Sequence, residues 1–357
     1  MSITRHIIGS LLAGVTLAVV CGCATNGGGT NVPSNSAAAA RYRDPVVRAT
    51  LRETAIAQLE TAATSDDPML RANALEGLGL VPGRIEPFLA DGLRDVNPGV
   101  RSVAAVMVGR VGAKSLAPEL RQLLDDSTPQ VRASAILSLR RLGEPVDPTP
   151  LASMLLHDGS MLVRSQAAFV LGELGDRSGL RLLRAGAKSS APRAGTAEIR
   201  LFQLQVAEAM AKLGDDSQIR TVRAALFPSR PEELEAMALA VQILGELGDR
   251  ASVDQLIFLT AYRNESKQTY PAEIRLAVAA ALAKLGRPEG VFIAREYAQN
   301  AEGVVRAQAA HVFGHAGGLE HLADLERMLG DSEGVVKVSA AVGILRVLNR
   351  SEADSRR

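Results

Sequence analysis

PGVRSVAAVMVGRVG (residues 98–112) and PQVRASAILSLRRLG (129–143) are two copies of one pattern, in which a basic residue stands eleven positions before a closing glycine. The same spacing recurs in MLVRSQAAFVLGELG (161–175), EIRLAVAAALAKLG (273–286) and GVVRAQAAHVFGHAG (303–317). With the degenerate copies included, the closing positions are residues 82, 112, 143, 175, 214, 248, 286, 317 and 348. A period of about 31 residues indicates a stack of similar supersecondary units.

Each unit is predicted to be a pair of helices. In the third unit, leucines recur at helical spacing through SLAPELRQLLDD (115–126), and apolar residues do so again in the copy that ends at Gly143. The side chains that we expect to be buried are Leu116, Leu120, Leu123 and Leu124 in the first helix, and Val131, Ala135, Leu139 and Leu142 in the second. A single pair has too little apolar surface to be stable alone, so neighbouring units must bury each other. The predicted fold is therefore all-α.

An aspartate six residues before the basic residue, an alanine-rich helix and a Leu-Gly ending make the pattern resemble HEAT repeats, in particular the short bacterial, phycobilisome-lyase-like kind. This resemblance implies a right-handed α-solenoid of about nine antiparallel helix pairs over residues 41–349. We expect residues 350–357 to be a disordered tail.

The resemblance also implies that the recurring charged residues form a structural ladder between adjacent repeats. An alternative is that they form a track that binds anions. Charges at recurring, partly buried positions are normally paired, which favours the ladder. The residues concerned are Asp95, Arg101, Asp126, Arg132, Asp158, Arg164, Asp331 and Lys337.

The amino-terminal segment carries both cysteines of the chain, Cys21 and Cys23, after an uncharged run over residues 7–20. That run is shorter than the about 20 residues that span a bilayer and is typical of an export signal. Val20-Cys21-Gly22-Cys23 resembles a bacterial lipobox, which implies cleavage after Gly22 and a diacylglycerol on Cys23. A plain secretory signal is the alternative.

Residues 23–40 are predicted to be a lipid-anchored flexible tether, because they are uncharged and rich in Gly, Ser, Asn and Ala. The 17 residues after Cys23 would reach about 20–25 Å, given about 5–6 Å times the square root of length. Ala24 follows the cysteine in place of an aspartate, so the lipobox resemblance favours the outer membrane, facing the periplasm. The lipid anchor would be the only contact with the membrane.

Charge argues against nucleic acid as a partner. Removal of residues 1–22 takes away Arg5 and no acidic residue, which leaves 39 basic residues (40 minus 1) against 39 acidic residues. The strong basic field of a nucleic-acid-binding protein is therefore absent from the sequence.

The sequence contains no phosphate loop, nucleophile elbow or zinc-protease motif. His311 and His315 are four residues apart, with His321 beyond them, but alignment with other repeats predicts that His311 is packed and His315 lies at the surface. We therefore predict no catalytic residues, no metal site and no cofactor.

Three consecutive units have enlarged links between their two helices, at residues 188–196, 227–231 and 263–272. Equivalent links emerge on the same rim of a solenoid, and tyrosine and arginine are favoured in interfaces. Long loops are also simply tolerated at surfaces, and that alternative stays open. The candidate partner-binding residues are Arg193, Arg230, Tyr262, Arg263, Lys267 and Tyr270.

These observations favour a non-catalytic, lipid-anchored scaffold or adaptor that binds a protein or peptide at the bacterial cell envelope. One alternative is an accessory or chaperone subunit of an envelope enzyme complex. A further alternative is an enzyme of the phycobilin-lyase-like type, which the name of the repeat alone does not establish.

Overall fold

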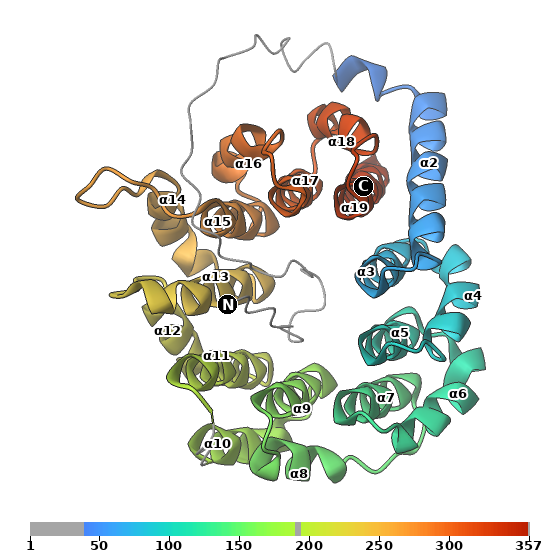
Figure 1. Ribbon diagram of the computed structural model, residues 1–357, viewed down its shortest axis with the longest axis vertical. Helices are drawn as coiled ribbons and strands as arrows, with labels where there is room; N and C mark the ends of the chain where they lie inside the picture. The colour runs from blue at the N-terminus through green and yellow to red at the C-terminus, as the bar shows by residue number, and fades with distance from the viewer. Residues whose placement is uncertain (1–38, 190–193, 356–357) are drawn as a thin grey trace.

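The computed structural model describes residues 39–189 and 194–355, and these residues form helices and connecting turns without a strand. The helices lie in two layers (Figure 1). The inner layer contains α3 (Pro68–Leu78), α5 (Pro98–Val111), α7 (Pro129–Leu142), α9 (Met161–Leu174), α11 (Thr196–Lys212), α13 (Leu234–Glu246), α15 (Ala272–Lys284), α17 (Gly303–Ala316) and α19 (Gly334–Ser355). The outer layer contains α2 (Pro45–Ala63), α4 (Pro82–Gly92), α6 (Ala117–Gln122), α8 (Pro150–His157), α10 (Leu180–Lys188), α12 (Ser217–Ala224), α14 (Val253–Ala261), α16 (Val291–Tyr297) and α18 (Leu322–Met328).

The ends of the inner helices follow from the repeated residues. A polar side chain before the helix commonly accepts a hydrogen bond from a backbone N–H two residues later, as Asn97 Oδ1 does from Gly99 N at 2.8 Å. The closing glycine adopts the left-handed conformation, for example Gly143 with φ 81°. A side chain at that φ would be strained, so glycine ends the helix where the pattern predicts.

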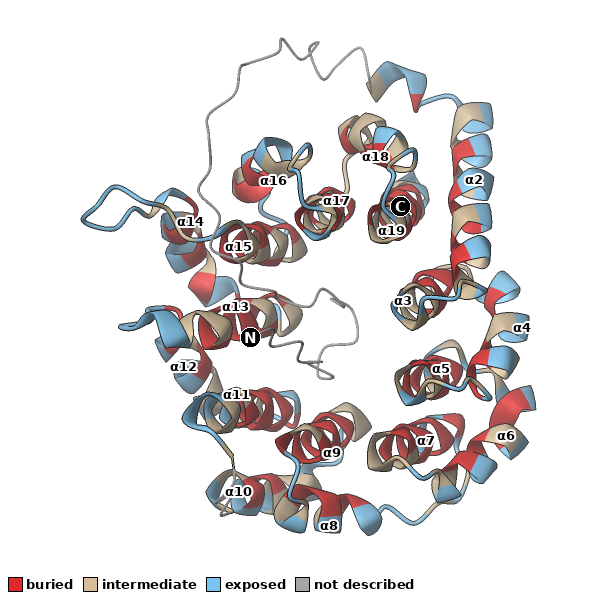
Figure 2. Ribbon diagram, in the orientation of Figure 1, coloured by how far each residue is buried: buried red, intermediate tan, exposed pale blue. Residues whose placement is uncertain are grey.

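The core lies between the two layers, where the facing sides of the helices are buried (Figure 2). In the third unit, seven of the eight side chains that we expected there are buried, and Leu124 is half-buried. Alanines at the contacts between inner helices, such as Ala209 of α11 against Gly172 of α9 and Ala281 of α15 against Gly245 of α13, are buried. Small residues there allow neighbouring helices to approach closely.

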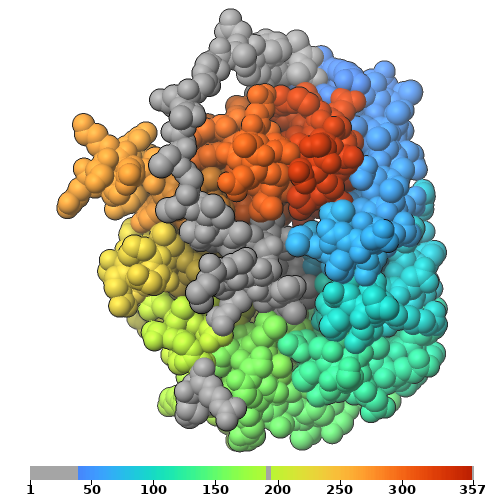
Figure 3. All heavy atoms as spheres, in the orientation of Figure 1, coloured from blue at the N-terminus to red at the C-terminus, as the bar shows by residue number. Residues whose placement is uncertain are grey.

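The stack of helices closes into a ring (Figure 1). The last inner helix, α19, packs on α2 and α3 at the start of the chain. Arg52 Nη1 donates to Asn349 Oδ1 at 2.8 Å, and Tyr42 Oη donates to Glu326 Oε2 at 2.6 Å. One hydrophobic cluster includes buried residues from both ends of the chain, and Figure 3 shows the first described residues, in blue, beside the last, in red. The sequence pattern did not predict this closure.

The prediction of a disordered tail from residue 350 was wrong for most of that segment, because α19 continues to Ser355. Its last turns lie beside α2, where Arg52 Nη2 donates to Glu352 Oε1 at 2.5 Å. Contacts with α2 therefore extend the helix beyond the last repeat. The predicted signal peptide and almost all of the predicted tether lie outside the described residues. No helix within residues 39–189 and 194–355 is both long and apolar enough to cross a bilayer.

Candidate functional site

Two of the predicted partner-binding residues meet at the largest of the enlarged links. The rings of Tyr262 and Tyr270 stack with their centroids 4.8 Å apart. Phe258, on α14, lies 5.9 Å from Tyr262 and is 56% exposed. Burial, together with the neighbouring Tyr262, raises the pKa of Tyr270 above its ordinary value. Three aromatic side chains thus form a partly exposed cluster, which we call the aromatic cluster.

The cationic candidates lie on the links themselves. Arg263 Nη1 donates to the Lys267 carbonyl at 3.1 Å, and Lys267 has φ 60°, so this link turns back on itself beside the aromatic cluster. Arg230, on the preceding link, pairs with Glu233 at 3.3 Å. Arg193 lies outside the described residues. Sequence reasoning did not identify Phe258, although an exposed phenylalanine on a short outer helix is a signal that a helical wheel would have shown.

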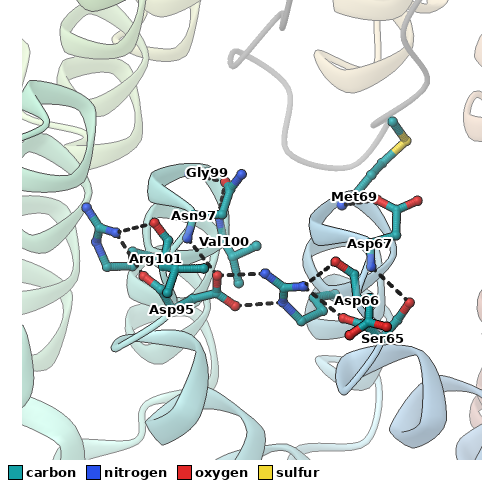
Figure 4. Close-up of polar contacts among 11 residues, drawn as sticks. Ser65, Asp66, Asp67, Met69, Asp95, Asn97, Gly99, Val100 and Arg101 are labelled. Atoms are coloured by element: carbon teal, nitrogen blue, oxygen red, sulfur yellow. Dashed lines mark hydrogen bonds and ion pairs between the residues drawn. The ribbon is translucent and has the colours of Figure 1, made fainter.

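The predicted ladder forms at three places. Arg71 donates to both carboxylate oxygens of Asp95, at 2.7 and 2.8 Å (Figure 4). Arg101 donates to Asp126 at 2.8 and 3.0 Å in the same way. The third bidentate pair joins Arg306 to Asp331 at 2.8 and 2.7 Å. Each pair links one repeat to the next, so the aspartate is held by the arginine of the repeat before it.

These ion pairs change the acidity of the aspartates. Burial alone would raise the pKa of Asp95 and of Asp126. The hydrogen bonds from the arginine and from a backbone N–H, together with the positive charge of the arginine, jointly outweigh burial and hold both pKa values below the ordinary value. Partly buried charges are stabilised only when they are paired in this way.

The ladder changes in the middle of the ring. Arg132 Nη1 donates to the carbonyl oxygens of Asp126 and Ser127 at 2.6 and 3.3 Å, and it makes no ion pair within the described part of the chain. Arg164 donates to the Asp158 carbonyl at 2.6 Å and to Ser189 Oγ at 2.8 Å. These arginines still fix the turn before their own helix.

Sequence reasoning missed a second set of ionisable residues, at the position two residues before each closing position from residue 112 onward. Ion pairs join several of these side chains between successive inner helices. Glu173 accepts from Lys212 at 2.8 Å and from Arg141, and Lys284 donates to Glu246. The residues at this position are Arg110, Arg141, Glu173, Lys212, Glu246, Lys284, His315 and Arg346. From Arg141 to Lys284 the charges alternate in sign, which is readable in the sequence, but only the packing of adjacent helices brings these side chains into contact.

His315 belongs to this set, and His311 lies beside it on α17. The ring centroids of His311 and His315 are 4.5 Å apart, and Arg346 Nη1 is 3.5 Å from His311 Nδ1. Burial, and then the nearby charges that include Arg346 and Lys284, lower the pKa values of both histidines. The prediction that His315 lies at the surface was wrong, because its Nε2 is buried without a hydrogen-bond partner.

His321 is separate from this pair. Its ring stacks on Phe313 with the centroids 5.6 Å apart. Within residues 39–189 and 194–355, no group of three or more His, Cys, Asp or Glu side chains has an arrangement suited to a metal ion.

Comparison with known proteins supports the predicted repeat. Residues 86–160 match a family model described as HEAT repeats. The match supports HEAT-type repeats within those residues, and the described residues as a whole form an all-α repeat fold. No curated protein matches the chain.

Three solved structures show low overall similarity. Human deoxyhypusine hydroxylase in complex with glycerol has 22% identity, covers 79% of this chain and 95% of its own, and gives a TM-score of 0.33. The complex of CpcE and CpcF of phycocyanin lyase from Nostoc sp. PCC7120 has 19% identity, with 68% and 92% covered and a TM-score of 0.39. The karyopherin Kap121p bound to the extreme C-terminus of the protein phosphatase Cdc14p has 12% identity, with 87% and 43% covered and a TM-score of 0.35.

Proposed function

We propose that this protein is a non-catalytic scaffold that binds a protein or peptide partner through the aromatic cluster and the links at residues 227–231 and 263–272. HEAT repeats are typical of protein-interaction scaffolds, and the family match supports that general role. The observation that carries the specific site is the stacked pair Tyr262 and Tyr270 next to an exposed Phe258. Aromatic side chains that pack together and remain accessible are enriched among the residues that dominate binding energy.

The charges around the aromatic cluster favour a partner segment that combines an apolar anchor with acidic residues. Arg263 and Lys267 are exposed on the projecting link, where a partner would meet them at the edge of the contact. Charges at such a rim mainly steer association and orientation, whereas buried aromatic contacts supply most of the affinity. We therefore expect the affinity to depend on Phe258 and Tyr270 and the association rate to depend on Arg263 and Lys267.

A site-specific cross-linking experiment tests this proposal. A photo-reactive amino acid at residue 258 should trap a partner in cells, and mass spectrometry would identify it. Phe292 is the matched control position, because it is a phenylalanine on the next outer helix and is 49% exposed.

Binding of the purified partner then provides the quantitative test. Phe258→Ala and Tyr270→Ala should each weaken binding about tenfold or more, the effect expected of an interface anchor. Their melting temperatures should stay within about 2 °C of the unchanged protein. Phe292→Ala should bind normally. Equal losses in all three variants, or no loss in the first two, would refute the proposed site.

We also propose that a lipid on Cys23 holds the protein at the bacterial cell envelope, facing the periplasm and more specifically at the outer membrane. The lipobox-like residues 20–23 and the uncharged segment after them support this proposal. Cys23→Ala should release the protein from membranes or block its processing, whereas Cys21→Ala should do neither. Equal membrane retention of the two variants would contradict it.

A further inference from the structure

Closure of the ring creates a place where the ladder has no carboxylate. In each of the three arginine–aspartate pairs of the ladder, the cation of one repeat contacts the aspartate that precedes the next inner helix, as Arg306 contacts Asp331. Because α19 packs on α2 and α3, the first repeat follows the last one around the ring. The next pair in the series would therefore join residue 337 to residue 65, across the closure.

Ser65 occupies the aspartate position of the first repeat. Its Oγ accepts a hydrogen bond from Asp67 N at 3.2 Å, as Asp95 Oδ1 accepts one from Asn97 N at 2.8 Å. Arg71 donates to the Ser65 carbonyl at 2.8 Å, as the arginine of the next repeat does to the Asp95 carbonyl (Figure 4). The turn is thus preserved, but a hydroxyl replaces the carboxylate.

Lys337 occupies the cation position of the last repeat. It is half-buried near the start of α19, and among the described residues it has neither an ion pair nor a hydrogen bond from its ammonium group. A pocket of about 430 Å³ lies between Lys337 and Ser65, at the position where three other repeat junctions hold an arginine–aspartate ion pair. Gln58, Thr61, Thr64 and Asp66 also line it.

We propose that this pocket binds a carboxylate group, which takes the place of the missing aspartate. The Lys337 ammonium would supply the charge-assisted contact. Ser65 and Gln58 line the same space and carry the hydroxyl and amide donors that would complete the recognition. Asp66 is exposed at the pocket, so its charge disfavours a highly charged polyanion and favours a ligand with a single carboxylate.

The carboxylate can come from a peptide terminus or from an acidic side chain, and two small probes distinguish these sources. N-acetylalanine presents a terminal carboxylate, whereas N-acetylaspartic acid α-amide presents a side-chain carboxylate. N-acetylalanine amide is the uncharged control. Titrations followed by saturation-transfer NMR would give the dissociation constant of each probe with the full-length protein.

Two variants test the site: one removes the charge of Lys337, and the other supplies the missing carboxylate. Lys337→Gln should weaken binding of the preferred acid at least tenfold, and Ser65→Asp should abolish binding and raise the melting temperature, because its carboxylate completes the ladder. Lys114→Gln is the control, since Lys114 is an exposed lysine far from the closure in sequence. Equal binding of the acids and the amide, or unchanged binding in Ser65→Asp, would overturn the proposal.

Direct neutralisation of Lys337 by Asp66 is the competing explanation. It predicts that the unchanged protein binds neither acid and that Asp66→Asn lowers the melting temperature. That pair of results would also overturn the proposal. All these measurements are independent of the aromatic cluster, so they leave the proposed scaffold function to be judged separately.

Discussion

Replacing Gly77 by alanine would test whether the ring is closed, because the sign of the effect depends on closure. In the interior of an exposed helix, alanine stabilises relative to glycine by about 1 kcal/mol. A Cβ at residue 77 of α3 would lie 2.7 Å from Val342 Cγ2 of α19 and 3.0 Å from Leu59 of α2. Forcing an extra methyl group into a packed contact costs about 1–3 kcal/mol. The net effect in the closed ring is therefore a destabilisation of up to about 2 kcal/mol.

The assay combines this variant with a partner that relieves the clash. Val342→Ala removes the clashing methyl group, so Gly77→Ala should cost less in that background, and the two changes should couple by about 1 kcal/mol. Gly83→Ala, whose added methyl group has no neighbour within 4 Å, should be neutral or stabilising. Urea unfolding and calorimetry would measure all four variants. If Gly77→Ala stabilises the protein as Gly83→Ala does, and adds independently to Val342→Ala, the closed ring is wrong.

Three further predictions follow from packing, charge and the links. Leu139→Ala, at a fully buried site, should lower the free energy of unfolding by about 2–5 kcal/mol, measured in urea. Arg132→Ala should lower it less, because the Arg132 guanidinium donates only to backbone carbonyls. A larger loss in Arg132→Ala than in Leu139→Ala would contradict this prediction. The pKa of Asp126 is lower in the folded protein than its unfolded value of about 3.8. The ion pair with Arg101 should therefore stabilise the folded protein at pH values above 3.8, and this stabilisation should be lost as the pH falls through the folded pKa. Asp126→Asn should therefore lower stability at pH 7 more than at pH 2, and an equal loss at both would argue against the pair. Shortening the links at 227–231 and 263–272 should abolish partner binding without lowering the melting temperature, and unchanged affinity would exclude that surface.

The candidate site was only partly predictable. Tyrosines, arginines and long links drew attention to residues 262–270, but sequence alone does not show that Tyr262 and Tyr270 stack, since they are separated by a turn. A ladder between adjacent repeats was expected, yet the sequence did not show which repeats would pair: the carboxylates of Asp95 and Asp126 contact the arginine of the preceding repeat, whereas Arg132 contacts no aspartate carboxylate among the residues that the structure describes. Pairing depends on the offset between neighbouring repeats, which a single chain pattern does not specify.

The sequence by itself determined the local units. The helical periodicity of apolar residues, the capping residues and the closing glycine all act within one repeat. The helices and their buried faces can therefore be predicted from the sequence. The tertiary structure alone decided that the stack closes. Closure depends on the small rotation between successive repeats, accumulated around the ring until α19 meets α2, and small differences in packing change that sum. The contact of Arg52 with Asn349, the continuation of α19 to Ser355 and the pocket between Ser65 and Lys337 all result from that meeting of the two ends.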